Sequence, residues 1–484
     1  GWVGSGLVRY PIALLRSGAT VNREPPGVFM ATSDKSRSKP DNIVFAPRAA
    51  QVAKREERFR RTADLIVDRH PAYRRIMRDA GLSRADIATT DDLERFPVTS
   101  KTDYMTAPAD YRLDTTGLAD DERALWDVMH TTGTTTGVPT PFFNTSYDFY
   151  RILTVQEGMM RLRGIGPDDS IANLFPLTVW PHGAYARVPH AAAAMKIPVI
   201  SALPGNPSEN FAHGSNLDEV VAIVARSRAT ILWGVPSYVR RVLIRAGELG
   251  AGFSSVRHVF VTGESTPEAM RTDFDTRLAA LGAKNAFVSI SYGATEMQGG
   301  MVECAPGSGF HNPAPDQFLI EIVDPETHRR VPAGTPGLVL LSHMDRRGTV
   351  LLRYALGDIS ALATAPCPHC GSETDRLVLT PARADSLKKV KGTLINPALI
   401  EEILIAHPAI SEYQIVFERE NMSDALSPDR LRVRIAGPPP EALPAIGDSI
   451  KSATGVTPAI DLESAQEIYA AGDTLKSRRI VDSR

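Results

Sequence analysis

Residues 130–140 carry the first pattern in this sequence that could do chemistry. They read His-Thr-Thr-Gly-Thr-Thr-Thr-Gly-Val-Pro-Thr, which is rich in hydroxyl groups and glycine. Glycine lets a backbone approach a ligand closely, and bare N–H groups together with threonine hydroxyls suit phosphate oxygens. The segment has no Gly-Lys-Ser or Gly-Lys-Thr, so it is not the Walker A loop of P-loop nucleoside triphosphatases. On composition alone, a phosphate-binding loop and a threonine-rich surface turn both remain open.

Two further segments place polar side chains after apolar runs. Residues 291–296 read Ser-Tyr-Gly-Ala-Thr-Glu and follow the apolar run 286–291. An aromatic face, close backbone and a metal-binding carboxylate at a strand end are typical of ligand sites in α/β sheets, although a simple strand-to-turn transition is the alternative. Residues 353–358 read Arg-Tyr-Ala-Leu-Gly-Asp, and their acidic end is suited to accept hydrogen bonds from the two hydroxyls of a ribose.

Two charged segments lie nearer the C-terminus. Residues 383–386 read Arg-Ala-Asp-Ser, and residues 474–482 read Thr-Leu-Lys-Ser-Arg-Arg-Ile-Val-Asp. A solvated basic tail is the ordinary explanation of the second segment.

Taken in order, these segments resemble the motifs of adenylate-forming enzymes, the acyl-CoA synthetase superfamily, and in particular the phenylacetate–CoA ligase family. The loop is similar to Thr-Ser-Gly-Thr-Thr-Gly-x-Pro-Lys, with one extra threonine and with Thr140 in place of the lysine. The segment 292–296 matches Tyr-Gly-x-Thr-Glu at every specified position, and 354–358 matches Tyr-x-x-Gly-Asp. Residues 383–386 resemble Arg-x-Asp-Asp with serine at the last position.

The resemblance implies a role for each motif. Tyr292 is expected near adenine, Thr295 at the α-phosphate and Glu296 on Mg²⁺. Asp385 is expected to be the hinge of a mobile C-terminal domain, and Lys476 to stabilise charge as the acid attacks phosphorus. The expected catalytic residues are thus Lys476, Thr295 and Glu296. The residues expected to bind the nucleotide are Thr132, Gly133, Thr134, Thr135, Thr136, Gly137, Tyr292, Gly293, Asp358 and Arg383.

By the same resemblance, the expected activity is ATP-dependent conversion of a small, aryl carboxylic acid into its acyl-AMP, with release of pyrophosphate and transfer to CoA. The expected acid pocket comprises Trp180, His182, Tyr185, Gly234, Pro236 and Ala294. Trp180 and His182 could equally be core residues. Two alternatives stay open: transfer of the activated acid, even an inorganic acid such as nitrite, to an amine or carrier protein, and a non-catalytic nucleotide- or zinc-binding protein.

The cysteines suggest a structural metal. Residues 367–371 read Cys-Pro-His-Cys-Gly, a form in which two thiolates can converge on one ion while the glycine permits a tight turn. Some phenylacetate–CoA ligase-like proteins carry a Cys/His zinc site, and this resemblance implies Cys304 and His311 as the other ligands beside Cys367 and Cys370. His369 is an alternative fourth ligand, and three unrelated thiols are the alternative to zinc.

The bulk composition limits the partners. Among 484 residues, 54 Lys and Arg stand against 56 Asp and Glu, so no basic field is present to collect nucleic acid or anionic lipid. The apolar stretches, such as 191–195, fall far short of the ~20 residues that cross a bilayer. With only three cysteines, a disulfide framework is not expected. We expect a cytoplasmic protein without nucleic-acid or membrane partners, and leave a homodimer open.

The elements that must position the motifs alternate between strand and helix. Short apolar runs at 170–175, 197–201, 230–234, 258–261 and 286–291 predict buried strands. Helical spacing lies between them, at 217–227, 236–249 and 267–281. This alternation predicts parallel βαβ units and an α/β fold.

The remaining segments complete the predicted organisation. Residues 49–80 predict amphipathic helices interrupted at Pro71, and 318–323, 337–342 and 349–354 predict the strands of a β-rich subdomain. We predict an extended segment over 1–48, a large adenylation domain over 49–382 and a small mobile α+β domain over 383–484.

Overall fold

The computed structural model describes residues 42–131, 139–178, 183–205, 213–383, 388–390, 393–423, 427–468 and 479–484. Within these ranges, no helix is long and apolar enough to cross a membrane.

A nine-stranded sheet forms the centre of the large domain, in the order β13-β14-β9-β8-β7-β6-β5-β3-β4. Its parallel part comprises β3 (Ile171–Asn173), β4 (Val199–Ser201), β5 (Ile231–Gly234), β6 (His258–Thr262) and β7 (Phe287–Ala294). Its antiparallel part comprises β8 (Gly299–Val302), β9 (Phe310–His311), β13 (Leu362–Ala363) and β14 (Arg376–Leu377).

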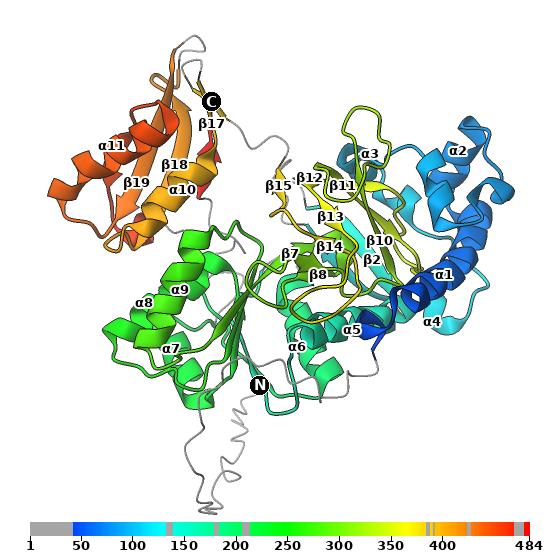
Figure 1. The fold of residues 1–484 in the computed structure, drawn as a ribbon, viewed down its shortest axis with the longest axis horizontal. Coiled ribbons are helices and arrows are strands. Elements are labelled where there is room, and N and C mark those ends of the chain that lie inside the picture. The colour runs from blue at the N-terminus through cyan, green and yellow to red at the C-terminus, as the bar shows by residue number, and fades with distance from the viewer. Residues whose placement is uncertain are drawn as a thin grey trace, which may run out of the picture. The chain divides into compact units, whose positions relative to one another are not determined.

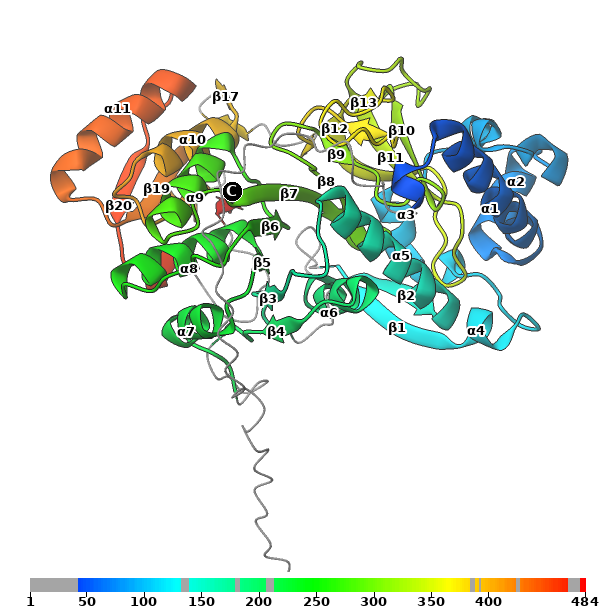
Figure 2. The same cartoon turned by 60° about the horizontal axis from the view of Figure 1, so that its bottom comes forward.

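Helices cover both faces of this sheet. Figures 1 and 2 show α7 (Leu217–Ser227), α8 (Pro236–Glu248) and α9 (Glu268–Ala280) on one side, and α5 (Ser146–Leu162) and α6 (Gly183–Met195) on the other. Because inner parallel strands such as β5 and β6 are covered on both faces, their sequences are largely continuous apolar runs. The predicted α/β fold with parallel βαβ units is confirmed.

The N-terminal helices follow the predicted break. The helix α1 (Arg48–Arg69) ends at His70, and α2 (Pro71–Asp79) begins with proline at its first position, where no helical N–H is needed. The short helix η1 (Ile43–Phe45) precedes α1. Five short elements follow α2: η2 (Arg84–Ile87), η3 (Thr90–Arg95), α3 (Lys101–Thr106), η4 (Pro108–Tyr111) and α4 (Asp120–Arg123).

A two-stranded hairpin frames the hydroxyl-rich loop. The strand β1 (Leu125–His130) pairs antiparallel with β2 (Pro141–Thr145), and His130 lies opposite Pro141. The Thr131 N–H also donates to the Thr140 carbonyl at 3.0 Å, so the ladder continues to the base of the loop.

The predicted β-rich subdomain is a four-stranded antiparallel sheet in the order β10-β11-β12-β15. It contains β10 (Phe318–Val323), β11 (Gly337–His343), β12 (Tyr354–Ser360) and β15 (Ala382–Arg383). The predicted strand over 349–354 is wrong, because the strand begins only at Tyr354. The preceding apolar residues are buried in a loop, where Arg353 adopts φ +46 and the Val350 N–H donates to the Tyr111 carbonyl.

The C-terminal part forms its own four-stranded sheet, in the order β20-β19-β18-β21. Figure 1 shows α10 (Pro397–Ala406) and α11 (Leu443–Thr454) packed beside β18 (Glu412–Arg419) and β19 (Asp429–Ala436). The smaller elements are β16 (Lys388–Val390), β17 (Thr393–Ile395), η6 (Pro440–Ala442), β20 (Ala459–Leu462), α12 (Ala465–Ile468) and β21 (Ile480–Asp482).

Candidate active site

A cavity of about 210 Å³ lies at the carboxyl ends of β5, β6 and β7. Ligands bind at this end of the strands in open α/β sheets. Its wall includes residues 291–296 at the end of β7, Asp358 on β12, and Thr131 at the base of the hydroxyl-rich loop. Three of the motifs found in the sequence therefore meet in one place.

Tyr292 and Asp358 are joined directly. The Tyr292 hydroxyl donates to Asp358 Oδ2 at 2.7 Å, although the two residues are 66 positions apart in sequence. In the β12–β15 ladder, Asp358 also lies opposite Arg383. The site thus places an aromatic ring, an acidic acceptor and the backbone of an arginine side by side.

The turn after β7 presents Thr295 and Glu296 to the cavity. It is the short helix η5 (Thr295–Met297), closed by Gln298 in the left-handed region at φ +52. His343 supports it from below, because its Nε2–H donates to the Glu296 carbonyl at 2.9 Å. Burial holds the pKa of His343 well below its usual range, which keeps the ring neutral.

A buried polar cluster holds the same turn from the other side. Arg187 on α6 makes two contacts of 3.1 Å to Asp127 Oδ2 and donates through Nε to Gln298 Oε1 at 3.2 Å. Gln298 Nε2 in turn donates to the Thr295 carbonyl at 2.6 Å. Gln156 Nε2 donates to the Gln298 carbonyl at 2.8 Å. We call Asp127, Gln156, Arg187 and Gln298 the clamp.

The clamp carries no net charge. The Arg187 guanidinium forms an ion pair with the Asp127 carboxylate. Burial lowers the pKa of Arg187, and the nearby Asp127 charge opposes that shift. His190 contacts Arg187 at 3.0 Å, and burial together with the Arg187 charge lowers the pKa of His190 to about 4, so His190 is neutral near pH 7.

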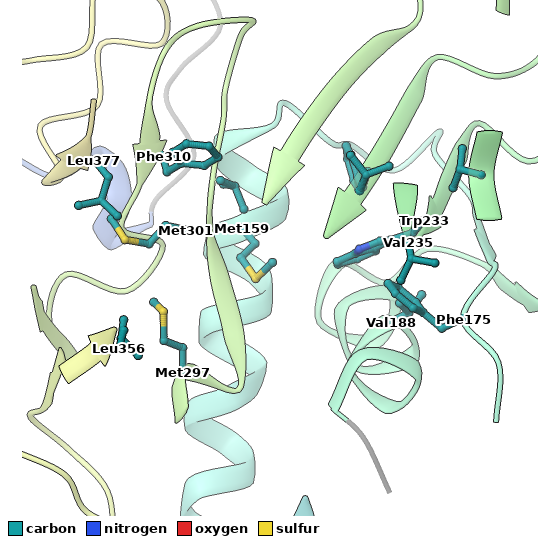
Figure 3. Close-up of a cluster of buried hydrophobic side chains, with 14 of the residues drawn as sticks. Met159, Phe175, Val188, Trp233, Val235, Met297, Met301, Phe310, Leu356 and Leu377 are labelled. Atoms are coloured by element: carbon teal, nitrogen blue, oxygen red, sulfur yellow. The ribbon is translucent and has the colours of Figure 1, made fainter. Parts of the chain in front are cut away.

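At the other end, the cavity wall is formed partly by aromatic side chains and partly by glycine backbone. Phe175, Trp233 and Met159 line it together with Gly299 and Gly300. Figure 3 shows Trp233 and Phe175 on one side and Met159 on the other.

The glycines at this end cannot be replaced without displacing their neighbours. A Cβ on Gly300 would lie 2.9 Å from the Gly293 Cα, and one on Gly293 would lie 2.9 Å from Thr262 Oγ1. Bare backbone is therefore required on this wall.

The predicted acid-pocket residues fall in different places. Ala294 lines the cavity. Tyr185 packs against the core, and its carbonyl accepts from Asn173 Nδ2, so the neighbouring Ala184 forms the wall instead. Gly234 serves packing, because a Cβ there would lie 3.1 Å from Leu174 Cβ.

Pro236 begins α8 and is buried. The remaining predicted residues, Trp180, His182, Thr132–Gly137, Asp385 and Lys476, lie outside the described residues, and so does the side chain of Arg383.

Lys101 is a cavity residue that the sequence analysis missed. It is the first residue of α3, whose N-cap Ser100 accepts from the Asp103 N–H, and it lines the cavity together with Thr131, Glu296 and Asp358. No motif marks this lysine, since it lies in a short segment between loops. Its only trace in the sequence is the Ser-Lys-Thr-Asp capping pattern.

The three cysteines lie together with His311. One ligand atom from each of Cys304, His311, Cys367 and Cys370 lies within 4.8 Å of the others. The Cys304 and Cys367 sulfurs are 3.7 Å apart, and Cys370 Sγ is 3.8 Å from His311 Nε2. His311 Nδ1 contacts Thr374 Oγ1 at 3.2 Å, which leaves Nε2 to the cluster. The hydrogen bond from Cys304 lowers the pKa of Cys367.

Known proteins resemble this chain in sequence and fold. Residues 190–345 match the family described as AMP-binding enzyme. The phenylacetate-coenzyme A ligase of Thermus thermophilus is 26% identical over 397 residues, which covers 81% of this chain and 83% of that protein. The Escherichia coli enzyme of the same name is 23% identical over 398 residues, covering 81% and 85%.

In fold, a crystal structure of 2-hydroxyisobutyryl-CoA ligase in the postadenylation state matches with a TM-score of 0.74. It is 22% identical and covers 91% of both chains. The fold and the cavity at the strand ends thus define an adenylate-forming enzyme. Within that superfamily, the chain is similar to phenylacetate–CoA ligases over about three quarters or more of its length.

Proposed function

We propose that the protein uses ATP to convert a small carboxylic acid into its acyl-AMP and then transfers the acyl group to CoA. In the first step, a carboxylate oxygen attacks the α-phosphorus of ATP and pyrophosphate leaves. In the second, the CoA thiol loses its proton and attacks the acyl carbon, and AMP leaves. The observation that carries the proposal is the meeting of Tyr292, Asp358 and Glu296 around one cavity at the strand ends.

In this proposal, the described residues make most of the contacts to the nucleotide. Tyr292 and Asp358 bind adenine and ribose in this proposal, and Thr295 contacts the α-phosphate. Lys101 adds a cation to the same wall, which offsets charge that develops on phosphorus. This matters because Thr140 takes the place of the lysine that ends the loop in relatives. Lys476 is proposed as a second cation.

Glu296 fits a Mg²⁺ ion, because its carboxylate is a hard oxygen donor at the cavity wall. When bound, the ion neutralises phosphate charge.

The Cys/His cluster fits structural zinc. Zn–S bonds of about 2.3 Å in a tetrahedron place two sulfurs about 3.8 Å apart, close to the 3.7 Å between Cys304 and Cys367. Three thiols and an imidazole fill four positions, so no place is left for substrate. The cluster connects the segment after β8 to the segment between β13 and β14, and we propose that zinc fastens these two parts of the sheet edge.

The acid is proposed to be a small aryl acid. Phe175 and Trp233 offer ring faces, and the backbone of Gly299 and Gly300 offers a flat opposite wall. We also propose Asp385 as the hinge and 383–484 as the domain that turns about it, between adenylation and thioester formation.

Pyrophosphate release tests the proposal. Purified protein is supplied with ATP and Mg²⁺ across a panel of aryl and aliphatic acids, with and without CoA. Release that depends on one acid, and an acyl-CoA product when CoA is added, is the expected result. Release without any effect of CoA identifies an amine or carrier-protein acceptor instead. No release from any acid contradicts adenylation.

A matched pair of variants assigns the activity to this cavity. Tyr292→Phe removes the hydroxyl that contacts Asp358 and is expected to lower kcat/KM for ATP about tenfold, since a hydrogen bond to a charged group contributes about 1.5–3 kcal/mol. Tyr150→Phe is the control, because that side chain is 60% exposed on α5.

A further inference from the structure

Arg479 is a buried arginine at the start of the C-terminal strand β21. Its side chain is 7% exposed, and it donates through Nη2 to Glu412 Oε1 at 3.0 Å and through Nη1 to the Tyr413 hydroxyl at 2.9 Å. The guanidinium carbon also lies 4.4 Å from the centre of the Tyr413 ring. Because a planar fork of donors that engages separate partners has one favourable orientation, these contacts fix the side chain.

The contacts of Arg479 continue into a helix. The Tyr413 hydroxyl, which accepts from Arg479, donates to Glu401 Oε1 at 3.0 Å. Glu401 lies on α10, whereas Glu412 and Tyr413 lie on β18, and all of these side chains are buried. A buried polar network thus links β21 to β18 and α10. We call Arg479, Glu412, Tyr413 and Glu401 the anchor.

The strand β21 has little burial of its own. It pairs in parallel with Ile415–Phe417 of β18, and the Arg479 carbonyl accepts from the Ile415 N–H at 2.7 Å. Within residues 479–484, only Arg479 is buried, while the side chains of the strand are exposed or half-buried. Apolar burial therefore contributes little to this attachment, and the anchor supplies its buried contacts.

The anchor also limits where a proposed catalytic group can lie. Lys476 precedes Arg479 by three positions and lies outside the described residues. Three residues span at most about 11 Å of chain, so the position of Arg479 restricts that of Lys476. The proposed function gives Lys476 the role of a cation at the attacked phosphorus. Such a charge needs a fixed origin, since small displacements of catalytic groups are costly.

The anchor is electrostatically connected to the cavity wall. Gly263 lines the cavity, and the next residue, Glu264, accepts from the Ser237 N–H at 3.0 Å and from the Ser237 hydroxyl at 2.9 Å. Burial lowers the pKa of Arg479, but the surrounding groups raise it above its ordinary value, namely Tyr413, Glu412, Glu264 and Glu401. Glu264 therefore lies within electrostatic range of the Arg479 guanidinium.

We propose that Arg479 is a positioning residue for adenylation, which holds the chain that carries Lys476 through its contacts to Glu412 and Tyr413. The inference rests on the proposed function and on the role given there to Lys476. Arg479 touches no reacting atom and acts through Lys476. Its effect on the rate should therefore disappear when Lys476 is absent.

A double-mutant cycle on the full chain tests this dependence. We would measure kcat and KM for ATP in pyrophosphate release, with the acid of the panel that gives the highest rate, for the wild type, Lys476→Met, Arg479→Met and the double variant. Lys476→Met is expected to lower kcat about 100-fold, and Arg479→Met about tenfold with KM for ATP nearly unchanged. The double variant should be no slower than Lys476→Met. Additive losses overturn the inference.

A second variant separates positioning from stability. Arg479→Met leaves the buried Glu412 carboxylate without its cation, which destabilises the fold. Adding Glu412→Gln removes that charge, so the urea midpoint should return toward the wild-type value while kcat stays low. Recovery of kcat together with the midpoint shows a purely structural role and overturns the inference.

Arg430→Met is the matched control on the same sheet. Arg430 pairs with Glu418 across β18 and β19, and its side chain is 41% exposed. Its variant should keep the wild-type kcat. A loss of kcat equal to that of Arg479→Met assigns the effect to the sheet as a whole and contradicts a particular role of Arg479.

Hydrogen exchange separates this inference from the proposed function, because it needs no substrate. In peptides that cover Ile415, amide exchange measured by mass spectrometry should be about tenfold faster in the variant with both Arg479→Met and Glu412→Gln than in Arg430→Met. Equal exchange overturns the anchor even in an active enzyme. A wild type that releases no pyrophosphate with any acid overturns the proposed function and the positioning role with it, whereas faster exchange then still assigns the attachment of β21 to Arg479.

Discussion

Replacing Arg187 by methionine tests how the active-site turn is held. The variant keeps a long side chain but removes the contacts to Asp127 and Gln298. Breaking a buried ion pair by removing one partner costs about 3–5 kcal/mol, because the other charge is left unpaired. The Asp127 side chain is 17% exposed, so water relieves part of this cost, and we expect a loss near the lower limit, about 3 kcal/mol.

The assay is urea unfolding followed by tryptophan fluorescence, in parallel with the kinetics of pyrophosphate release. Arg187→Met is expected to lower the free energy of unfolding by about 3 kcal/mol and kcat/KM at least tenfold, since small displacements of catalytic groups are costly. Adding Asp127→Asn should recover at least half of the lost stability, because no unpaired charge then remains. A loss below about 1 kcal/mol, or no recovery in the double variant, would refute the reasoning.

Three further predictions concern separate parts of the chain. Burial lowers the pKa of His70 to about 4, so the neutral ring contributes to folding stability fully above its unfolded pKa of about 6.5 and this contribution is lost as pH falls through 4. Between pH 7 and pH 4, the free energy of unfolding of the wild type should therefore fall by about 3 kcal/mol more than that of His70→Gln. Lys101→Met should lower kcat for pyrophosphate release about 10–100-fold at an unchanged urea midpoint, and full activity would remove Lys101 from the site. Cys304→Ser should abolish stoichiometric zinc binding, measured by inductively coupled plasma emission spectrometry, and should lower the thermal midpoint of unfolding as a chelator does in the wild type. A metal-free wild type of equal stability would contradict a zinc site.

The parallel strands could be predicted because burial on both faces leaves a continuous apolar run. The run at 230–234 is an example, since β5 is buried along its whole length. The run at 349–354 shows the limit of that reasoning. Its apolar residues are equally buried, but Arg353 at φ +46 interrupts extended backbone. Burial alone therefore does not distinguish a strand from a buried loop.

The site was predictable where chemistry is concentrated in a motif, and not where it is assembled from distant positions. Tyr292 and Asp358 are each marked by local sequence, and the structure joins them. No local sequence motif marks the residues of the clamp. Arg187 lies 60 residues from Asp127 and 111 from Gln298, so only the packing of α6 against the sheet brings the three together.

The clamp also connects the two ends of the cavity, and this yields a final prediction. Gln156 holds the Gln298 carbonyl, and Gln298 holds the carbonyl of Thr295 at the phosphate end. Gln156→Leu removes the bond to the Gln298 carbonyl and so loosens this chain of hydrogen bonds.

Gln156→Leu should therefore lower kcat for adenylation, because groups held less firmly in the reactive geometry raise the barrier. Steady-state kinetics separates the effect on kcat from the effect on KM. If the variant changes KM alone and leaves kcat equal, the two ends are not coupled, and the clamp serves only to position the turn.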